Sequence, residues 1–170
     1  MHFNPYGGAA AELAAALVNA DPDSTADELL DLLREHDYKP LGALDDDQAR
    51  DLTAWAARLS PVFDHTPDQI ALVNDLLAEG AAKPYISTHD GRRPHLHFAP
   101  EHAPTPQRLR AFTAAGLAHV VCDDPGRLGR CARPGCGTVY VDTSRNGRRR
   151  FCTTRCANRV HVADHRTRTA

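Results

Sequence analysis

The sequence is poor in the features that membrane and secreted proteins need. No uninterrupted apolar run approaches the ~18 residues of a membrane span, because even the apolar stretch over residues 9–20 is broken by Glu12 and Asn19. The first residues lack the basic flank, apolar core and small-residue cleavage site of a signal peptide. We therefore expect a soluble cytoplasmic protein with no membrane partner.

Several signatures of enzyme active sites are also missing. The chain has no glycine-rich phosphate-binding loop, no persuasive Ser/His/Asp combination and no pair of carboxylates suited to acid–base catalysis. Aromatic residues make up only 6% of the chain. Because a helical core needs such residues, Trp55, Phe63, Tyr38 and Tyr85 are expected to pack in the core rather than to line a ligand pocket. We expect a protein that is not an enzyme.

The charge of the chain is distributed unevenly along its 170 residues. Residues 1–90 contain 5 Lys and Arg against 17 Asp and Glu, a net charge of −12. Residues 127–170 contain 11 Arg and 2 Asp, a net charge of +9. This asymmetry predicts an acidic body followed by a basic segment that binds a polyanion. Arginine is the side chain best suited to bidentate contacts with phosphate and guanine.

Apolar residues recur at helical spacing through most of the first 125 residues. The spacing and the capping residues predict helices over 8–20, from a cap at Asp23 or Ser24, over 45–59, from Thr66 and from Thr105. Two strands are predicted over 83–88 and 94–99 around a turn at 89–92, and a buried thiol is expected at Cys122. Residues 123–126 are the predicted joint between domains 1–125 and 126–170. The expected fold class is α+β, predominantly helical.

Four of the five cysteines lie within 26 residues near the C-terminus. Cys131 and Cys136 are separated by four residues, Cys152 and Cys156 by three, and fifteen residues lie between the pairs. In a cytoplasmic protein this pattern favours one metal site over two disulfides. Four thiolates form a closed tetrahedron, so the predicted cofactor is one structural Zn²⁺. The segment is too poor in apolar residues to fold without it.

The order of elements around these cysteines predicts a treble-clef-like finger. A tight turn at residues 132–135 would bring the first pair together, and a short hairpin over 138–142 and 148–151 would follow. A helix is expected from Thr153 to about Arg166, with the second cysteine pair at its start.

This segment resembles the CGNR zinc finger. The resemblance covers Cys131-x4-Cys136, residues 141–146 and 148–152, and the tetrapeptide 156–159, which gives the family its name. Ala157 replaces the glycine of that tetrapeptide, and Phe151 occupies a position where an aromatic residue is usual. The resemblance implies an upstream ABATE-like domain, to which residues 1–125 are similar in layout. It also implies a bacterial transcription regulator, often linked to stress.

Polar residues of the finger form a candidate nucleic-acid surface. On the predicted final helix, arginines at spacings of four and seven share one side, where they could contact guanine, and the adjacent Asn158 could contact adenine. Arginines of the predicted hairpin are placed to contact phosphates. The candidate residues are Arg145, Arg148, Arg149, Arg150, Arg155, Asn158 and Arg159. An alternative is that Arg145, Asn158 and Arg159 brace the zinc site.

The sequence thus predicts a zinc-dependent protein that binds double-stranded DNA and regulates transcription. One finger buries little surface, so specificity is expected from a homodimer, with the body as a dimerisation domain or as a sensor for an unidentified small-molecule effector. Two alternatives remain open. The finger could instead bind RNA or a protein, or His95 and His97, on one face of a strand, could hold a second metal in an enzyme or sensor.

Overall fold

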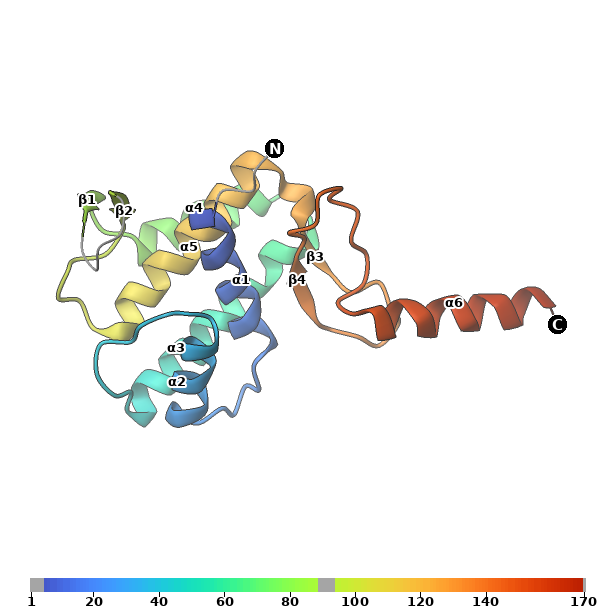
Figure 1. Ribbon diagram of the computed structural model, residues 1–170. Coiled ribbons are helices and arrows are strands. Elements are labelled where there is room, and N and C mark those ends of the chain that lie inside the picture. The colour runs from blue at the N-terminus through green and yellow to red at the C-terminus, as the bar shows by residue number, and fades with distance from the viewer. Residues whose placement is uncertain (1–4, 89–93, 170) are drawn as a thin grey trace.

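The computed structural model describes residues 5–88 and 94–169, so the predicted turn at 89–92 lies outside the described residues. The helices are α1 (Pro5–Asn19), α2 (Ala26–Glu35), α3 (Asp46–Leu59), α4 (Gln69–Gly80), α5 (Thr105–Asp123) and α6 (Thr154–Thr169). The strands are β1 (Tyr85–Ser87), β2 (His95–His97), β3 (Leu128–Arg130) and β4 (Val139–Val141), and the two short 3-10 helices are η1 (Ser60–Asp64) and η3 (Pro125–Arg127). The predicted α+β, predominantly helical class is confirmed (Figure 1).

Local hydrogen bonds fix where the helices begin. Asp45 caps α3, at the predicted start of the helix over 45–59. The cap of α2 is Thr25 rather than Asp23 or Ser24, because the Thr25 hydroxyl and Glu28 form a capping box across the first turn. The fourth helix begins at Gln69, not at Thr66.

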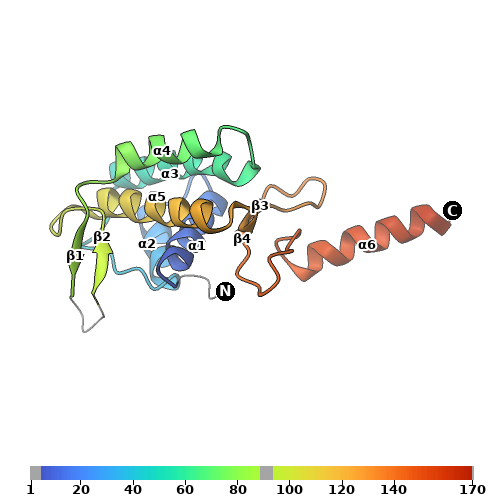
Figure 2. The same cartoon turned by 90° about the horizontal axis from the view of Figure 1, so that it is seen from above.

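Helix α5 lies at the centre of the body, between α1 and α4 (Figure 2). Its Gly116 allows the close crossing of α1, because a Cβ at this position would lie 2.4 Å from the Cβ of Ala10. The Trp55 indole donates a hydrogen bond of 3.0 Å to the Thr113 hydroxyl on α5, which ties α3 to the same centre. Cys122 is exposed, contrary to the sequence expectation. It lies about 200° around the helix from the buried Val120.

Two large apolar clusters and one small one lie among the described residues of the body, and one of the large clusters extends into the C-terminal segment. The first cluster lies between α1, α2, α3 and α5 and includes Leu13, Leu33 and Leu52. The second includes Trp55 and Phe63, which are core residues as predicted, and also Leu128, Val139 and Val141 of β3 and β4. The strands that carry the cysteine turn therefore pack directly on the helical body.

Two polar contacts reinforce this packing. The Asn19 side chain at the end of α1 donates to the Val139 carbonyl (2.9 Å) and accepts from the Val139 amide (2.8 Å), as a neighbouring strand would. The Arg130 guanidinium on β3 forms two bonds with the Asp64 carboxylate, of 2.7 and 3.2 Å. Both contacts join residues far apart in the sequence.

The strands form two separate antiparallel pairs, β1 with β2 and β3 with β4. The hairpin predicted between residues 138–142 and 148–151 is therefore wrong, because the ladder partner of β4 is β3. Residues 148–151 instead form a loop, held to β4 by side-chain contacts such as the bond from the Tyr140 hydroxyl to the Arg149 carbonyl (2.6 Å).

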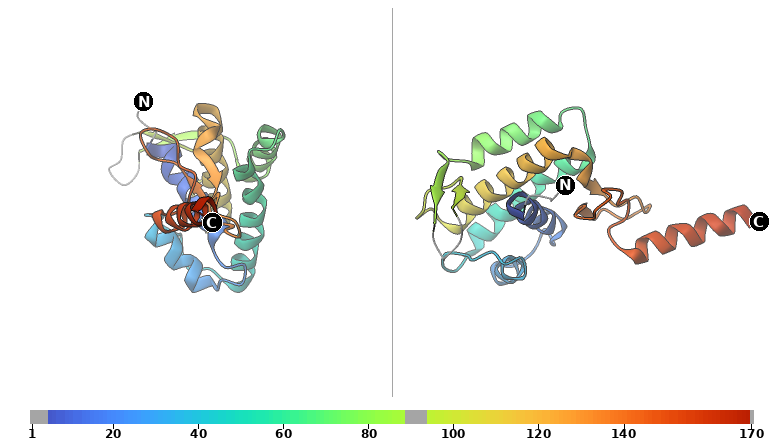
Figure 3. Two further views of the ribbon diagram at one scale, coloured as in Figure 1. Left: turned by 90° about the vertical axis from the view of Figure 1, so that its right-hand side faces the viewer. Right: turned by 45° about the horizontal axis from the view of Figure 1, so that its top comes forward.

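Helix α6 projects away from the rest of the molecule (Figure 3). It continues past the predicted end at Arg166 to Thr169. Within the described part of the chain, no helix has the combination of length and apolar character that crossing a membrane requires.

Candidate metal centre and nucleic-acid interface

Two short local structures bring the four cysteines together. Cys131 follows β3, and its amide donates to the Thr138 carbonyl (2.9 Å), so the chain between them closes as a loop. Gly135, in this loop, has a φ of +73°, a conformation that glycine adopts without strain. Cys152 precedes α6 and Cys156 lies in its first turn, where the Cys156 amide bonds to the Thr153 hydroxyl (3.2 Å).

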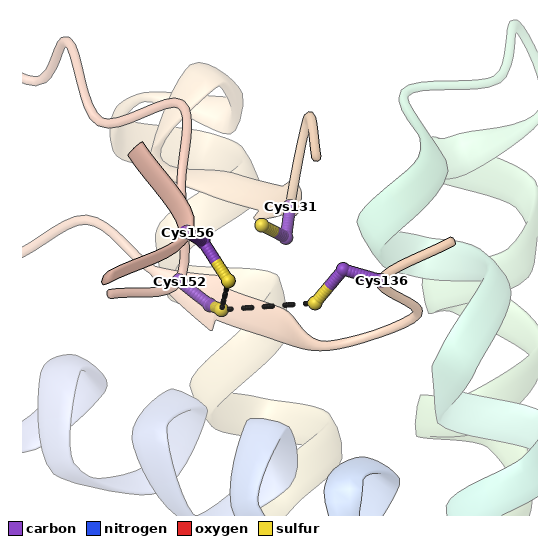
Figure 4. A group of neighbouring side chains, drawn as sticks. All are labelled: Cys131, Cys136, Cys152 and Cys156. Atoms are coloured by element: carbon purple, nitrogen blue, oxygen red, sulfur yellow. Dashed lines mark hydrogen bonds between the residues drawn. The ribbon is translucent and has the colours of Figure 1, made fainter. Parts of the chain in front are cut away.

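The four sulfur atoms converge on one point (Figure 4). All lie within 4.8 Å of one another, with 3.8 Å between Cys136 and Cys152 and 3.5 Å between Cys152 and Cys156. A tetrahedral zinc ion with Zn–S bonds of ~2.3 Å would separate its sulfurs by about 3.8 Å. The four cysteines are thus positioned to bind a metal ion, and they fit zinc.

The thiols differ in their ease of ionisation. Hydrogen bonding with Thr138 lowers the pKa of Cys136 to about 6. Burial raises the pKa of Cys152 to about 11. Metal binding requires all four thiolates, so it must displace protons, that of Cys152 above all, and the affinity should fall as the pH falls.

Arg133 and Arg149 brace the centre, and these roles were not predicted from the sequence. The Arg133 Nε donates to the Cys156 sulfur at 3.3 Å, and hydrogen bonds to Cys156 and Cys136 raise the pKa of the guanidinium. Arg149 lies over the Tyr140 ring, 4.7 Å from its centroid, and donates to the carbonyls of Phe151 (3.0 Å) and Cys152. Arg149 thus links β4 to the segment that enters α6.

Asp142 organises the loop that follows β4 and carries the other arginines of the predicted hairpin. Its side chain is buried and accepts backbone bonds from Ser144 (2.9 Å) and Arg149 (2.7 Å). Burial alone would raise the pKa of Asp142, but these bonds hold it below its usual value. Arg127 closes the loop from outside by donating to the carbonyls of Asp142 and Ser144, both at 2.8 Å.

The remaining candidate residues point to solvent. Arg145, Arg148 and Arg150 are exposed on the loop, and Arg150 lies near the Phe151 ring. On α6, one face forms an open depression lined by Arg155, Asn158, Arg159, Val162, Ala163 and Arg166. No hydrogen bond joins Arg145, Asn158 or Arg159 to the thiols among the described residues, and the bracing suggested for them is supplied by Arg133 and Arg149.

Residues 127–169 match the family model of the CGNR zinc finger. This segment is a CGNR zinc finger. The match begins at η3, so the finger includes β3 and β4 as well as the two cysteine pairs and α6. Ala157 suits its helical position, because alanine is the best helix former. Comparison of the chain with curated proteins gave no significant match.

The structure places the other predicted pair, His95 and His97, on β2. The two rings lie on one face of the strand, with 3.0 Å between their Nε2 atoms. Across residues 5–88 and 94–169, no group of three or more metal-binding side chains is found beyond the four cysteines.

Proposed function

We propose that the protein binds double-stranded DNA through its zinc finger and acts as a transcription regulator. The observation that carries the proposal is the exposed basic face of α6. The 16 residues of this helix span about 24 Å. A helix of ordinary diameter fits the ~12 Å major groove, and α6 projects clear of the body that would otherwise block its approach (Figure 3).

The roles of the polar residues follow from where they lie. Arg155, Asn158 and Arg159 share the exposed face of α6, where their side chains would reach base edges. Arg148 and Arg150 lie on the loop beside the start of α6, where they would contact the phosphate backbone on either side of the groove. We leave Arg149 out of the proposed surface, because its exposed guanidinium already contacts the Tyr140 ring and backbone carbonyls.

Electrostatics supports approach by the finger end alone. Residues 127–170 carry a net charge of +9, while residues 1–90 carry −12. Four thiolates with one Zn²⁺ subtract about two charges from the finger, which stays basic. The acidic body would repel DNA, so the protein would bind with α6 facing the DNA and the body turned away from it. A single finger buries little surface, and a homodimer through the body would supply the specificity.

The test is DNA binding by the zinc-loaded protein, measured by fluorescence anisotropy over a range of salt concentrations. Phosphate contacts give a log–log slope of about −0.9 for each phosphate neutralised. Arg148→Ala with Arg150→Ala should weaken binding to all duplexes and reduce the slope by about 2. Asn158→Ala with Arg159→Ala should mainly reduce discrimination between sequences.

Arg50→Ala is the matched control, because Arg50 is an exposed arginine on α3 in the body. It should leave affinity and slope unchanged. Absence of binding at low salt with zinc in place would contradict the proposal. Equal or tighter binding of an RNA duplex, or of an acidic protein alone, would assign the arginine face to that partner instead.

A further inference from the structure

The β1–β2 ribbon half-buries its histidines and exposes its aliphatic residues, the reverse of what a purely structural element would do. Antiparallel pairing places Tyr85 opposite His97 and Ser87 opposite His95, and all four are half-buried. The opposite face carries the cross-strand pair Ile86 and Leu96, which are 70% and 53% exposed. Side chains exposed in this way forfeit much of the stabilisation that burial would bring. Local departures of this kind are expected at functional sites.

The two imidazoles on the half-buried face aim the same nitrogen at one point. The Nε2 atoms of His95 and His97 lie 3.0 Å apart, and the ring centroids lie 4.8 Å apart with 41° between the ring planes. Either a proton or a cation between the nitrogens accounts for this approach. Imidazole nitrogen is a good ligand for Zn²⁺, Ni²⁺ and Cu²⁺.

The separation of the nitrogens fits a metal ion with little movement. With metal–nitrogen bonds of ~2.05 Å, a gap of 3.0 Å corresponds to an angle of about 95° at the metal. This is close to the right angle of square-planar and octahedral sites, which Ni²⁺ and Cu²⁺ prefer. A tetrahedral zinc ion would need the nitrogens to separate to about 3.4 Å.

A third group on the same face lacks a hydrogen-bond partner. The Tyr85 hydroxyl is buried, and the described residues provide it with no partner. Its ring lies 5.2 Å from that of His97, centroid to centroid. Two histidines leave several coordination positions to water, and a metal-bound water would supply the partner that the hydroxyl lacks.

We propose that His95 and His97 chelate a divalent transition-metal ion at a site separate from the four cysteines. The ribbon lies at the end of the body remote from α6 (Figures 1 and 2). The site belongs to the body rather than to the finger, and it does not depend on DNA binding by α6.

The test uses the full chain with zinc already bound, titrated with Ni²⁺ by isothermal calorimetry. We expect one equivalent of Ni²⁺ to bind in addition to the zinc. Loss of even an outer partner of a metal ligand costs 10–100-fold in affinity, so His95→Ala or His97→Ala should weaken binding by more than about 10-fold. Zinc content, measured by mass spectrometry before and after, should stay constant, which shows that Ni²⁺ has not displaced zinc from the thiolates.

His102→Ala is the control, because His102 is an exposed histidine just before α5. It should bind Ni²⁺ as the parent chain does. His97→Gln keeps a polar side chain, so it removes the imidazole with less risk of misfolding the ribbon. Circular dichroism checks that each variant is folded. No Ni²⁺ binding by the parent chain, or equal binding by the double variant His95→Ala/His97→Ala, would overturn the proposal and leave the pair sharing a proton.

Discussion

The helical body and the finger achieve a fixed structure in opposite ways. The body buries large apolar side chains such as Leu13, Trp55 and Leu117 in two clusters. Beyond β4, the finger has few buried residues, and its order depends on four converging thiols and on buried or stacked polar groups such as Asp142 and Arg149. An apolar core leaves the surface of the body free to be acidic. A metal-centred core needs so few side chains that almost all of α6 is free to face a ligand.

The border between these two regions does not follow the order of the sequence. Strands β3 and β4 belong to the finger by family, but their apolar residues belong to the cluster of the body. The finger thus has a packed half, β3 and β4, and a half that we expect to be metal-dependent, which comprises α6 and the loops around the cysteines. Substitutions on either side of that border should separate the two contributions.

Removal of zinc should have the largest effect, and a different one on each side of the border. Structural zinc contributes about 10–16 kcal/mol in small fingers, so chelation or Cys152→Ser should unfold α6 and the loops around the cysteines. Helices α1 to α5 should remain folded, because their clusters contain no metal ligand. Amide hydrogen exchange resolved by segment measures the expected loss of structure in α6 and its retention in α1 to α5.

The amides of β4 are the informative ones in that experiment. Val139 is held by Asn19 and by the shared cluster, so it should stay protected after α6 has lost its protection. Cys122→Ser, which alters an exposed cysteine outside the metal site, is the control and should change nothing. A uniform rise in exchange through α1 to α5 would show instead that the metal stabilises the whole chain.

Leu128→Ala should destabilise the body although Leu128 lies in the finger. The side chain is fully buried in the shared cluster, and truncation of a buried leucine costs about 2.7–5 kcal/mol. Urea denaturation of the zinc-loaded protein should show this loss in the transition of the body. Val162→Ala, at a half-exposed position on α6, should stay within about 0.5 kcal/mol. A loss of stability confined to the finger would show that Leu128 does not stabilise the body.

Sequence patterns revealed what depends on local spacing. The helices followed from apolar periodicity, and the convergence of the four cysteines followed from two short gaps that a turn and a helix start can close. The pairing of β3 with β4 and the shared cluster were not predicted, because they depend on contacts between distant segments. Asn19 interrupts an apolar run in the sequence, where its role is not visible. In the structure its side-chain oxygen lies 2.8 Å from the amide nitrogen of Val139, a residue 120 positions further along the chain.

The arginines illustrate the same limit at the site. Arg148, Arg149 and Arg150 are indistinguishable in composition and charge. All three side chains are exposed, and what distinguishes Arg149 is its contact with the Tyr140 ring and with backbone carbonyls. Sequence alone fixes neither the direction of each side chain nor its partner.

Gly116→Ala should test the centre of the body without touching the metal-dependent half. An added Cβ would lie 2.4 Å from the Cβ of Ala10 and 2.7 Å from the Ala11 amide nitrogen, so α1 must move away from α5. Overpacking of this kind costs about 1–3 kcal/mol, which thermal unfolding should detect. Gly137→Ala, where nothing lies within 4 Å of the added Cβ, should be nearly neutral. Equal melting temperatures for the two variants would show that the crossing of α1 and α5 is looser than the structure indicates.

Asp142→Asn should produce a smaller change, confined to the metal-dependent half. The carboxylate accepts the amides of Ser144 and Arg149, and an asparagine has only one acceptor oxygen for these two donors. A buried donor left without a partner costs about 1–3 kcal/mol. We expect faster exchange of these two amides and weaker DNA binding, with the stability of α1 to α5 unchanged.

Because Asp142 ionises, the effect of Asp142→Asn on the stability of the loop should depend on pH. Because the pKa of Asp142 is held below its usual value, its contribution to stability is present above the ordinary carboxyl pKa and is lost as the pH falls through the lowered value. Loop stability should therefore differ between Asp142→Asn and the parent chain at neutral pH and converge in acid. Asp123→Asn, at an exposed site on α5 outside this loop, is the control and should leave the stability of the loop equal to that of the parent chain. A difference that persists in acid would mean that the asparagine acts through altered packing rather than through the lost carboxylate, and the loop would then depend on the shape of residue 142 more than on its charge.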